Sequence, residues 1–211
     1  EQLQLLDEQT VELAPDMLVI ADANGPVALA GIMGGKPTSV ERVTVDVFLE
    51  AAFFAPAAIA GRARRLGLST DSSHRFERGV DFGATRQAME RATQLLIDIC
   101  GGQPGPISET TAALPQREPI TLRLARLKRV AGVELDTDQV QRDLVALGAR
   151  VERQADCLVV TPPSFRFDLA IEEDLIEEAV RLYGYDNIPA QPPAAPSRML
   201  PQDETLLADD T

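Results

Sequence analysis

Residues 164–189 read SFRFDLAIEEDLIEEAVRLYGYDNIP and predict an amphipathic helix over 171–183. Apolar residues recur on one side of this helix, which we expect to pack into a domain core. They are Ile171, Leu175, Leu182 and Tyr183. Gly184 follows as a residue of the type that commonly ends a helix. The stretch therefore predicts a helix with one buried side and one acidic side.

The acidic side is dense, because six carboxylates and no base fall within eleven residues. These are Asp168, Glu172, Glu173, Asp174, Glu177 and Glu178. Asp174, Glu177 and Glu178 stand at i, i+3 and i+4, so they share a face, and Asp168 precedes the helix by a short turn. Hard cations such as magnesium take carboxylate oxygens, so these acids are a candidate metal site. The simpler interpretation is a solvated face, because acids in a first helical turn interact favourably with the helix macrodipole.

The second half of the chain has the element order strand, helix, helix, hairpin, helix, which is typical of a winged-helix-like domain. The elements are expected over 120–124, 127–130, 137–147, 149–153 with 158–161, and 171–183. The hairpin is expected to turn at Gln154, Ala155 and Asp156.

The first half mixes strands and helices. Residues 17–35 predict a hairpin, because apolar runs flank an Asn-Gly turn dipeptide. Residues 44–54 alternate and then become continuously apolar, which predicts a strand buried on at least one face. Helices are expected over 57–66 and 82–100, each stopped by glycine, with a polar loop between them.

Two domains of the α+β class are therefore expected. Residues 1–105 form a mixed α/β domain, and residues 119–190 form the small winged-helix-like domain. Residues 106–118 are proline-rich and lack a periodic pattern, which is typical of a linker. Residues 191–211 are rich in proline and alanine and then acidic, so we expect disorder there.

Composition narrows the class of protein. The 211 residues contain no apolar run near the roughly 20 residues of a membrane span. A net charge of -13 disfavours non-specific binding to nucleic acid. Cys100 and Cys157 are too few and too far apart for a disulfide framework or a zinc site, which fits a cytoplasmic protein. The chain has neither an initiator Met nor a secretory signal, so we expect an internal segment of a longer protein.

The RFD motif at 166–168, the acidic run and the YGYDNIP motif at 183–189 resemble those of bacterial phenylalanine–tRNA ligase beta subunits. The resemblance implies that magnesium is shared with a catalytic alpha subunit. The implied ligands are Asp168, Asp174, Glu177 and Glu178. It also implies an assembly of two alpha and two beta subunits, in which alpha uses ATP to attach phenylalanine to its tRNA. The chain alone is not expected to aminoacylate, and it has no GxxxxGK[ST] phosphate-binding loop.

The first domain resembles the editing domain of the same family, through AGIMGG at 30–35, GRARR at 61–65 and TDSSHRFERGVD at 70–81. Such a domain hydrolyses tyrosine wrongly attached to the phenylalanine tRNA. A pocket for phenylalanine rejects an added hydroxyl by only about a hundredfold, so a second site must select for that hydroxyl. By the resemblance, the editing pocket is lined by Gly34, Glu50, Thr70 and Ser72.

Glu50 is the residue best suited to select tyrosine. It lies in the apolar run VFLEAAF at 47–53, where an unpaired carboxylate is costly and a tyrosine hydroxyl can pair with it. The alternative is an ion pair with Arg62 or Arg65. Ser72 stands where the family often has alanine, so its part in selection stays open. Part of the editing domain is expected upstream of this chain, so weak activity and self-association through apolar surface are expected of the chain alone.

His74, the only histidine, lies among Arg75, Glu77 and Arg78 and is expected to brace a loop, so no catalytic base is assigned. Two other functions stay open. One is a nucleic-acid-binding winged-helix protein. Its contact patch would be Arg123, Arg126, Lys128 and Arg129. The other is a non-catalytic subunit-interaction scaffold that presents the acidic helix to a partner.

Overall fold

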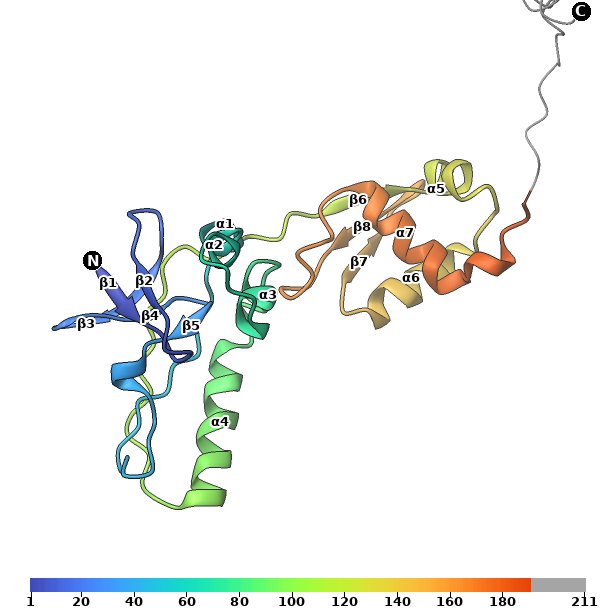
Figure 1. The fold of residues 1–211 in the computed structure, drawn as a ribbon. Coiled ribbons are helices and arrows are strands. Elements are labelled where there is room, and N and C mark those ends of the chain that lie inside the picture. The colour runs from blue at the N-terminus through green and yellow to red at the C-terminus, as the bar shows by residue number, and fades with distance from the viewer. Residues whose placement is uncertain (191–211) are drawn as a thin grey trace, which may run out of the picture.

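The computed structural model describes residues 1–190, and the tail expected to be disordered lies outside the described residues. Figure 1 shows two compact units that follow one another along the chain and are joined by a segment without helices or strands. Both units combine helices with antiparallel strands, so the fold is α+β, as the sequence predicts. None of the helices in the described part combines the length and apolarity needed to cross a membrane.

Two small antiparallel sheets open the first unit. They consist of β1 (Gln2–Gln4) with β2 (Thr10–Glu12), and of the meander β3 (Val19–Asp22), β4 (Gly25–Leu29) and β5 (Met33–Gly34). A bridge between Leu5 and Gly35 joins the two sheets. The expected hairpin is thus confirmed, and the Asp22 carboxylate stabilises its turn by accepting the Asn24 N–H at 2.7 Å.

Three short helices, one longer helix and the 3-10 turn η1 (Lys36–Thr38) complete the described part of the first unit. The helices are α1 (Pro56–Ile59), α2 (Arg62–Arg65), α3 (Asp71–Phe76) and α4 (Thr85–Cys100). The single helix expected over 57–66 is divided, because Gly61 between α1 and α2 has a φ of +76°. The helix expected to end at Cys100 is confirmed, with Gly101 at its C-cap.

The core of the first unit lies between the two sheets and the short helices. Leu5, Leu29 and Ile59 are at most 2% exposed, and they connect the residue after β1 with β4 and α1 in one apolar cluster. Burying a side chain of this size contributes about 1.5–3 kcal/mol, so a few such residues carry much of the stability of so small a unit.

The prediction of a strand over 44–54 is wrong. This segment has no regular secondary structure, and no strand within residues 1–190 pairs with it. Its alternating apolar residues are therefore left in solvent, with Val45 90% exposed and Phe48 92% exposed. Only its last part, from Glu50 onward, turns inward toward the body of the unit.

The second unit has the element order that the sequence predicts. It consists of β6 (Ile120–Arg123), α5 (Leu124–Ala131), α6 (Thr137–Ala146), β7 (Arg150–Arg153), β8 (Cys157–Thr161), α7 (Glu172–Tyr183) and the 3-10 turn η2 (Tyr185–Asn187). The sheet order is β6-β8-β7, because the β7–β8 hairpin inserts β8 beside β6. Figure 1 shows α7 lying across this sheet, with α5 and α6 beside it.

The buried side of α7 differs in part from the expected one. Leu175 is fully buried, but Ile171 is 56% exposed and Leu182 is 41% exposed. Tyr183 is 39% exposed as well. The residues that enter the core with Leu175 are Ile176, Ala179 and Val180. The helix is therefore rotated relative to the predicted face.

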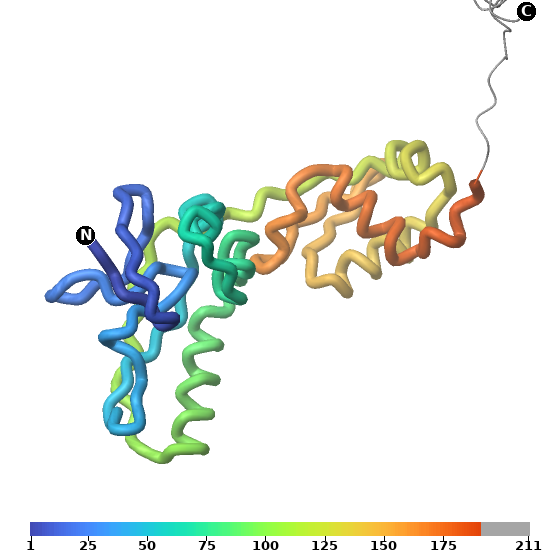
Figure 2. Tube along the Cα trace, in the orientation of Figure 1, coloured from blue at the N-terminus to red at the C-terminus, as the bar shows by residue number. Residues whose placement is uncertain are grey.

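The two units touch at one loop of the second unit. The Phe167 ring lies 6.1 Å from the Phe53 ring and 6.2 Å from the Phe82 ring, measured between centroids. In Figure 2 this loop, between β8 and α7, reaches back toward the region of α3. Away from this loop and the connecting segment, the two units lie apart from each other (Figure 2).

Candidate functional site

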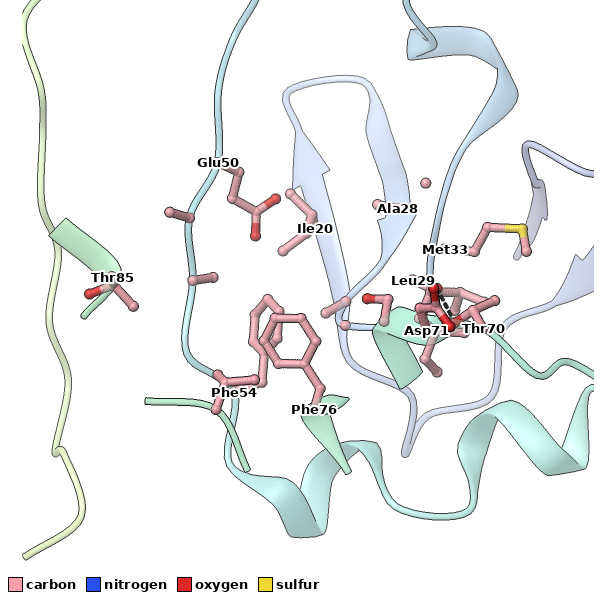
Figure 3. Close-up of a pocket in the computed structure, with 18 of the residues that line it drawn as sticks. Ile20, Ala28, Leu29, Met33, Glu50, Phe54, Thr70, Asp71, Phe76 and Thr85 are labelled. Carbon is pink, nitrogen blue, oxygen red and sulfur yellow. Dashed lines mark hydrogen bonds between the residues drawn. The ribbon is translucent and has the colours of Figure 1, made fainter. Parts of the chain in front are cut away.

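A cavity of about 840 Å³ opens in the first unit, between β3 to β5, the inner end of the 44–54 segment, and α3 and α4. Figure 3 shows the residues around it, with the Phe54 and Phe76 rings side by side at its base. Most of the lining is apolar, and the polar side chains among the lining residues are Glu50, Thr70, Asp71, Ser72, Asp81 and Thr85. The structure thus brings all four predicted pocket residues, Gly34, Glu50, Thr70 and Ser72, to one cavity.

Glu50 lies at the rim of this cavity, exposed on its outer side, and points toward Ile20 (Figure 3). Partial burial raises the pKa of its carboxyl group. The alternative ion pairs are not formed, because Arg62 and Arg65 both bind Asp16 instead. Within residues 1–190 no ion pair or hydrogen bond engages the Glu50 side chain. An unpaired carboxyl group therefore faces an apolar cavity.

Thr70 is the N-cap of α3, and its hydroxyl group is already engaged in the fold. Its Oγ1 donates to the Ile32 carbonyl oxygen at 2.9 Å and accepts from the Ser73 N–H at 3.0 Å. Ser73 completes a capping box by accepting the Thr70 N–H. Thr70 therefore shapes the cavity wall by fixing the start of α3, and it holds Ser72 in the first turn, at the cavity surface.

Glycine is needed next to the two rings at the base of the cavity. Gly31 has a φ of +66°, and a Cβ atom built there would lie 3.0 Å from the Phe76 ring and 3.2 Å from the Phe54 ring. At Gly34 an added Cβ would meet only the flexible Leu6 side chain, at 3.3 Å. Gly31 is thus the glycine on which the shape of the cavity depends most, and the family pattern did not single it out.

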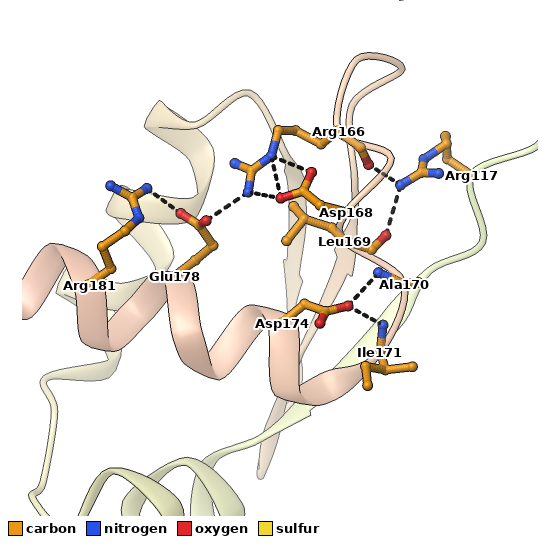
Figure 4. A network of polar contacts seen from close by, with 9 residues as sticks. All are labelled: Arg117, Arg166, Asp168, Leu169, Ala170, Ile171, Asp174, Glu178 and Arg181. Atoms are coloured by element: carbon orange, nitrogen blue, oxygen red, sulfur yellow. Dashed lines mark hydrogen bonds and ion pairs between the residues drawn. The ribbon is translucent and has the colours of Figure 1, made fainter. Parts of the chain in front are cut away.

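A second polar cluster lies in the second unit, where Arg166 stands between two of the acids. Arg166 Nη2 donates to Asp168 Oδ2 at 2.7 Å and to Glu178 Oε1 at 2.7 Å. Arg181 binds the other oxygen of Glu178. Figure 4 shows this chain of contacts from Arg181 through Glu178 and Arg166 to Asp168. Glu178 is only 8% exposed, and a buried carboxylate is costly unless it is paired. The guanidinium groups of Arg166 and Arg181 supply this pairing.

These contacts set the acidity of the cluster. The hydrogen bond from Arg166 lowers the pKa of Asp168. Burial acts to raise the pKa of Glu178, but the hydrogen bonds from Arg181 and Arg166 outweigh it and lower that pKa below its usual range. Both carboxyl groups are therefore ionised at neutral pH.

The other two predicted metal ligands are arranged differently. Asp174 Oδ2 accepts the N–H groups of Ala170 and Ile171, at 2.7 Å and 2.8 Å, and so caps the first turn of α7. Glu177 is exposed, whereas its neighbour Glu178 points inward. The predicted shared face is therefore divided between solvent, a helix cap and the interior.

Magnesium, which the family resemblance implies, does not fit these four carboxylates as they are arranged. A guanidinium group already occupies the space between Asp168 and Glu178, and Asp174 is committed to backbone N–H groups. No group of three or more His, Cys, Asp or Glu residues close enough to hold a metal occurs in residues 1–190. The sequence did not reveal Arg166 as their counter-ion, because it precedes the acidic run.

The basic patch proposed for nucleic-acid binding is largely paired within the chain. Arg123 binds Glu172 at 2.6 Å, and Arg126 binds Glu173. Lys128 binds Glu134 at 2.7 Å. These pairs neutralise most of the patch and give a role to the two acids that the resemblance left unassigned. The nucleic-acid-binding alternative is therefore not favoured.

His74 does not line the cavity. It is exposed on α3, and its Nδ1 atom lies 3.1 Å from Arg78 Nη1, which also binds Glu77 at 2.7 Å. This arrangement agrees with a bracing role for the loop that follows α3.

Comparison with known proteins assigns both units to domain families. The model of the B3/4 domain matches residues 1–101, and the model of the tRNA synthetase B5 domain matches residues 120–185. The first matched region contains the cavity, and the second contains α7 with its acids.

Relatives match along the chain at high identity. The phenylalanine–tRNA ligase beta subunit of Thiobacillus denitrificans is 82% identical over 210 residues, which are 100% of this chain and 27% of the relative. That of Aromatoleum aromaticum is 56% identical over 207 residues, 97% of this chain and 26% of the relative. That of Methylococcus capsulatus is 53% identical over 212 residues, 100% of this chain and 27% of the relative. The chain spans about a quarter of the length of these relatives.

The two domain matches follow each other in the same order as the two units, and every relative named above carries one and the same name. The chain therefore belongs to the family of phenylalanine–tRNA ligase beta subunits, of which it is a segment with a B3/4 domain followed by a B5 domain.

Proposed function

We propose that the cavity of the first unit binds the tyrosyl group of wrongly charged phenylalanine tRNA, so that the ester bond is hydrolysed. The observation that carries this proposal is the unpaired Glu50 carboxyl group at the rim of an apolar cavity. An aromatic ring can enter such a cavity, and a phenolic hydroxyl can reach a polar group that phenylalanine would leave unsatisfied.

Glu50 selects the substrate and is not a nucleophile in this proposal. The tyrosine hydroxyl donates a hydrogen bond to the carboxylate, and this contact partly replaces the water that Glu50 loses. Phenylalanine offers no such donor, so its ester binds less well. Ser72 lies in the first turn of α3 and adds a hydroxyl group to the lining of the same cavity.

Hydrolysis is proposed to proceed by direct attack of water on the ester carbonyl carbon, with the tRNA hydroxyl as the leaving group. The lining residues include no cysteine and no histidine, so the described part of the cavity offers no Ser-His-Asp or Cys-His arrangement for an acyl-enzyme. The residues of this chain bind and orient the ester, and no catalytic base is assigned among them.

The test is deacylation of tyrosyl-tRNA by the enzyme assembled from the longer beta subunit and its alpha partner. Glu50→Ala is expected to lower the rate, whereas the control Glu12→Ala, an exposed carboxylate on β2, is expected to leave it unchanged. Unchanged deacylation in Glu50→Ala would remove Glu50 from the site and with it the proposed selection.

For the whole protein we propose the activity that its relatives' name states, ligation of phenylalanine to its tRNA. ATP and magnesium are used on the alpha subunit, in a cytoplasmic assembly of two alpha and two beta subunits. This chain alone does not aminoacylate, and the apolar segment around Phe48 favours its self-association. The proposed domain limits are 1–105 and 119–190, with 106–118 as linker.

A magnesium ion shared between alpha and this chain would need a different arrangement of the acids. Arg166 would have to leave Asp168 and Glu178, and Asp174 would have to give up its helix cap. The proposed function uses no step that depends on such an ion. The surface formed by Asp168 and Glu177, both exposed, is instead a candidate contact for the alpha subunit.

A further inference from the structure

We propose that Phe167 of the second unit is a positioning residue for the cavity of the first unit. This inference rests on the proposed function, because it assigns a role in the same deacylation reaction. It makes the second unit part of the editing site without any contact between Phe167 and the substrate.

Phe167 packs between Phe53, Phe82 and Gly79 of the first unit, which we call the aromatic socket. Its ring is stacked on Phe53 at 6.1 Å with an interplanar angle of 18°, and it meets Phe82 edge-on at 6.2 Å and 85°. Phe53 and Phe82 also contact each other, at 5.7 Å and 70°. Each ring thus touches both others in geometries that aromatic pairs prefer, so removal of one ring loosens the other two.

The first unit leaves space for this ring by means of a glycine. A Cβ atom built on Gly79 would lie 2.4 Å from Phe167 Cγ, so any other residue there would force the ring or the backbone to shift. Gly79 also has a φ of +99°, a conformation that other residues rarely adopt. The backbone at Gly79 is therefore shaped to the Phe167 ring.

The socket and the cavity share their walls. Ala52 and Phe54, the chain neighbours of Phe53, line the cavity. Val80 and Asp81, which lie between Gly79 and Phe82, line it as well. Two separate segments of chain therefore contribute residues both to the cavity lining and to the contact with Phe167. The first of them carries Glu50 only three residues before Phe53.

The loop that carries Phe167 is held between the connecting segment and α7. On one side Arg117 donates to the carbonyl oxygen of Arg166 and, at 2.8 Å, to that of Leu169, and its guanidinium lies 5.6 Å from the Phe167 ring centroid. On the other side the Arg166 side chain ties the loop to Glu178 of α7 (Figure 4). The acids of the second unit thus fix the loop, and the loop fixes Phe167.

The experiment uses the enzyme assembled from the longer beta subunit and its alpha partner. Phe167→Ala is expected to lower kcat/KM for deacylation of tyrosyl-tRNA by at least about tenfold, because small misplacements of an aligned site are costly. Phe167→Leu keeps apolar volume in the socket and is expected to retain an intermediate rate. The matched control is Phe165→Ala, because Phe165 is on the same loop but 50% exposed and contacts Gly148 of its own unit.

A role limited to joining the two units would not alter the choice of substrate. We expect Phe167→Ala to lower the ratio of tyrosyl to phenylalanyl deacylation, since the Glu50 segment loses its support, and to leave aminoacylation unchanged. In the 211-residue chain, Phe167→Ala is expected to raise the rate of amide hydrogen exchange over residues 79–85 relative to wild type. In this segment the Ala84 N–H donates to the Asp81 carbonyl oxygen. This second readout needs no activity.

The outcomes separate this inference from the proposed function. If Glu50→Ala loses deacylation while Phe167→Ala matches Phe165→Ala in rate and substrate ratio, the positioning role is overturned and the proposed function stands. If Glu50→Ala retains full deacylation, the proposed function itself is overturned. A lower rate in Phe167→Ala with unchanged exchange over 79–85 also overturns the inference, because the wall would not have moved.

Discussion

Arg166 Nη2 and Glu178 Oε1 lie 2.7 Å apart, and this pair joins residues that are twelve positions apart in the chain. The two side chains are 18% and 10% exposed, so the pair is largely shielded from water. It connects the loop before α7 to the middle of α7 (Figure 4). The acidic stretch that identifies the family thus owes its local structure to an arginine outside the acidic run.

Loss of the arginine should destabilise the second unit. Arg166→Met is expected to lower the free energy of unfolding by about 2–3 kcal/mol, since a buried carboxylate would lose one of its two charged partners. The double variant Arg166→Met with Glu178→Met should recover much of this loss. Urea denaturation measures both, with Arg86→Met, which breaks an exposed pair with Glu90, as the control. Equal effects of Arg166→Met and the control would contradict the account.

The same cluster predicts how stability depends on pH. The folded-state pKa values of Asp168 and Glu178 are lowered, so their contribution is present above the unfolded value of about 4 and is lost as pH falls through the folded values. The urea midpoint of the chain should therefore decline from about pH 5 to about pH 3. Arg166→Met should show a shallower decline, and an identical slope in the two proteins would argue against the pair.

The effect of Glu50 on the pH dependence of stability has the opposite sign. Its pKa is raised by burial, so the unfolded chain ionises first and stability decreases as pH rises from the unfolded value of about 4.3 through the folded one. Glu50→Gln should remove this decrease. The comparison of urea midpoints of wild type and Glu50→Gln between about pH 4 and about pH 7 measures it. A constant difference at every pH would mean that Glu50 is not buried enough to matter.

Magnesium should not bind to the acids of the chain by itself. Calorimetric titration of the 211-residue chain with magnesium is expected to give no saturable heat, because Arg166 and two backbone N–H groups engage three of the carboxylates. Saturable binding by wild type that Asp174→Ala abolishes would show that the acids rearrange around the ion. The same pair of proteins, assembled with the alpha subunit, tests the shared site.

Gly31 should be the glycine on which the cavity depends most. Gly31→Ala places a Cβ atom 3.0 Å from the Phe76 ring at a φ of +66°, so we expect a loss of about 1–2 kcal/mol in the free energy of unfolding. Gly105→Ala is the control, because nothing lies within 4 Å of an added Cβ there. Thermal unfolding measures the difference, and equal midpoints would contradict the packing described.

The order of elements in the second unit was predictable because its periodicity is local. Leu122 alternates with exposed neighbours in β6, Leu158 alternates with half-buried neighbours in β8, and Leu175 lies on the buried side of α7. The strand expected over 44–54 was wrong because its pattern indicates a buried face, whereas no strand in the described chain covers it. A pattern reports what a residue prefers and not which neighbours are present.

The candidate site also has features that were predicted from the sequence and features that were not. The location of Glu50, Thr70 and Ser72 at one cavity was predicted from the family resemblance. Helix α3, which begins after Thr70 and contains Ser72, was not predicted, because a Thr70–Ser73 capping box starts a helix in a polar stretch. The roles of Arg166 and Phe167 depend on contacts between distant parts of the chain. No local pattern records such contacts, so the sequence alone did not show them.

Selection of tyrosine by Glu50 can be measured as the ratio of tyrosyl-tRNA to phenylalanyl-tRNA deacylation by the assembled enzyme, for wild type and for Glu50→Ala. We expect this ratio to fall toward one in Glu50→Ala, because only tyrosine has a hydroxyl group to pair with the carboxylate. We expect aminoacylation by the same preparation to stay unchanged. A ratio that stays at the wild-type value in Glu50→Ala would contradict the claim that this cavity selects tyrosine through Glu50.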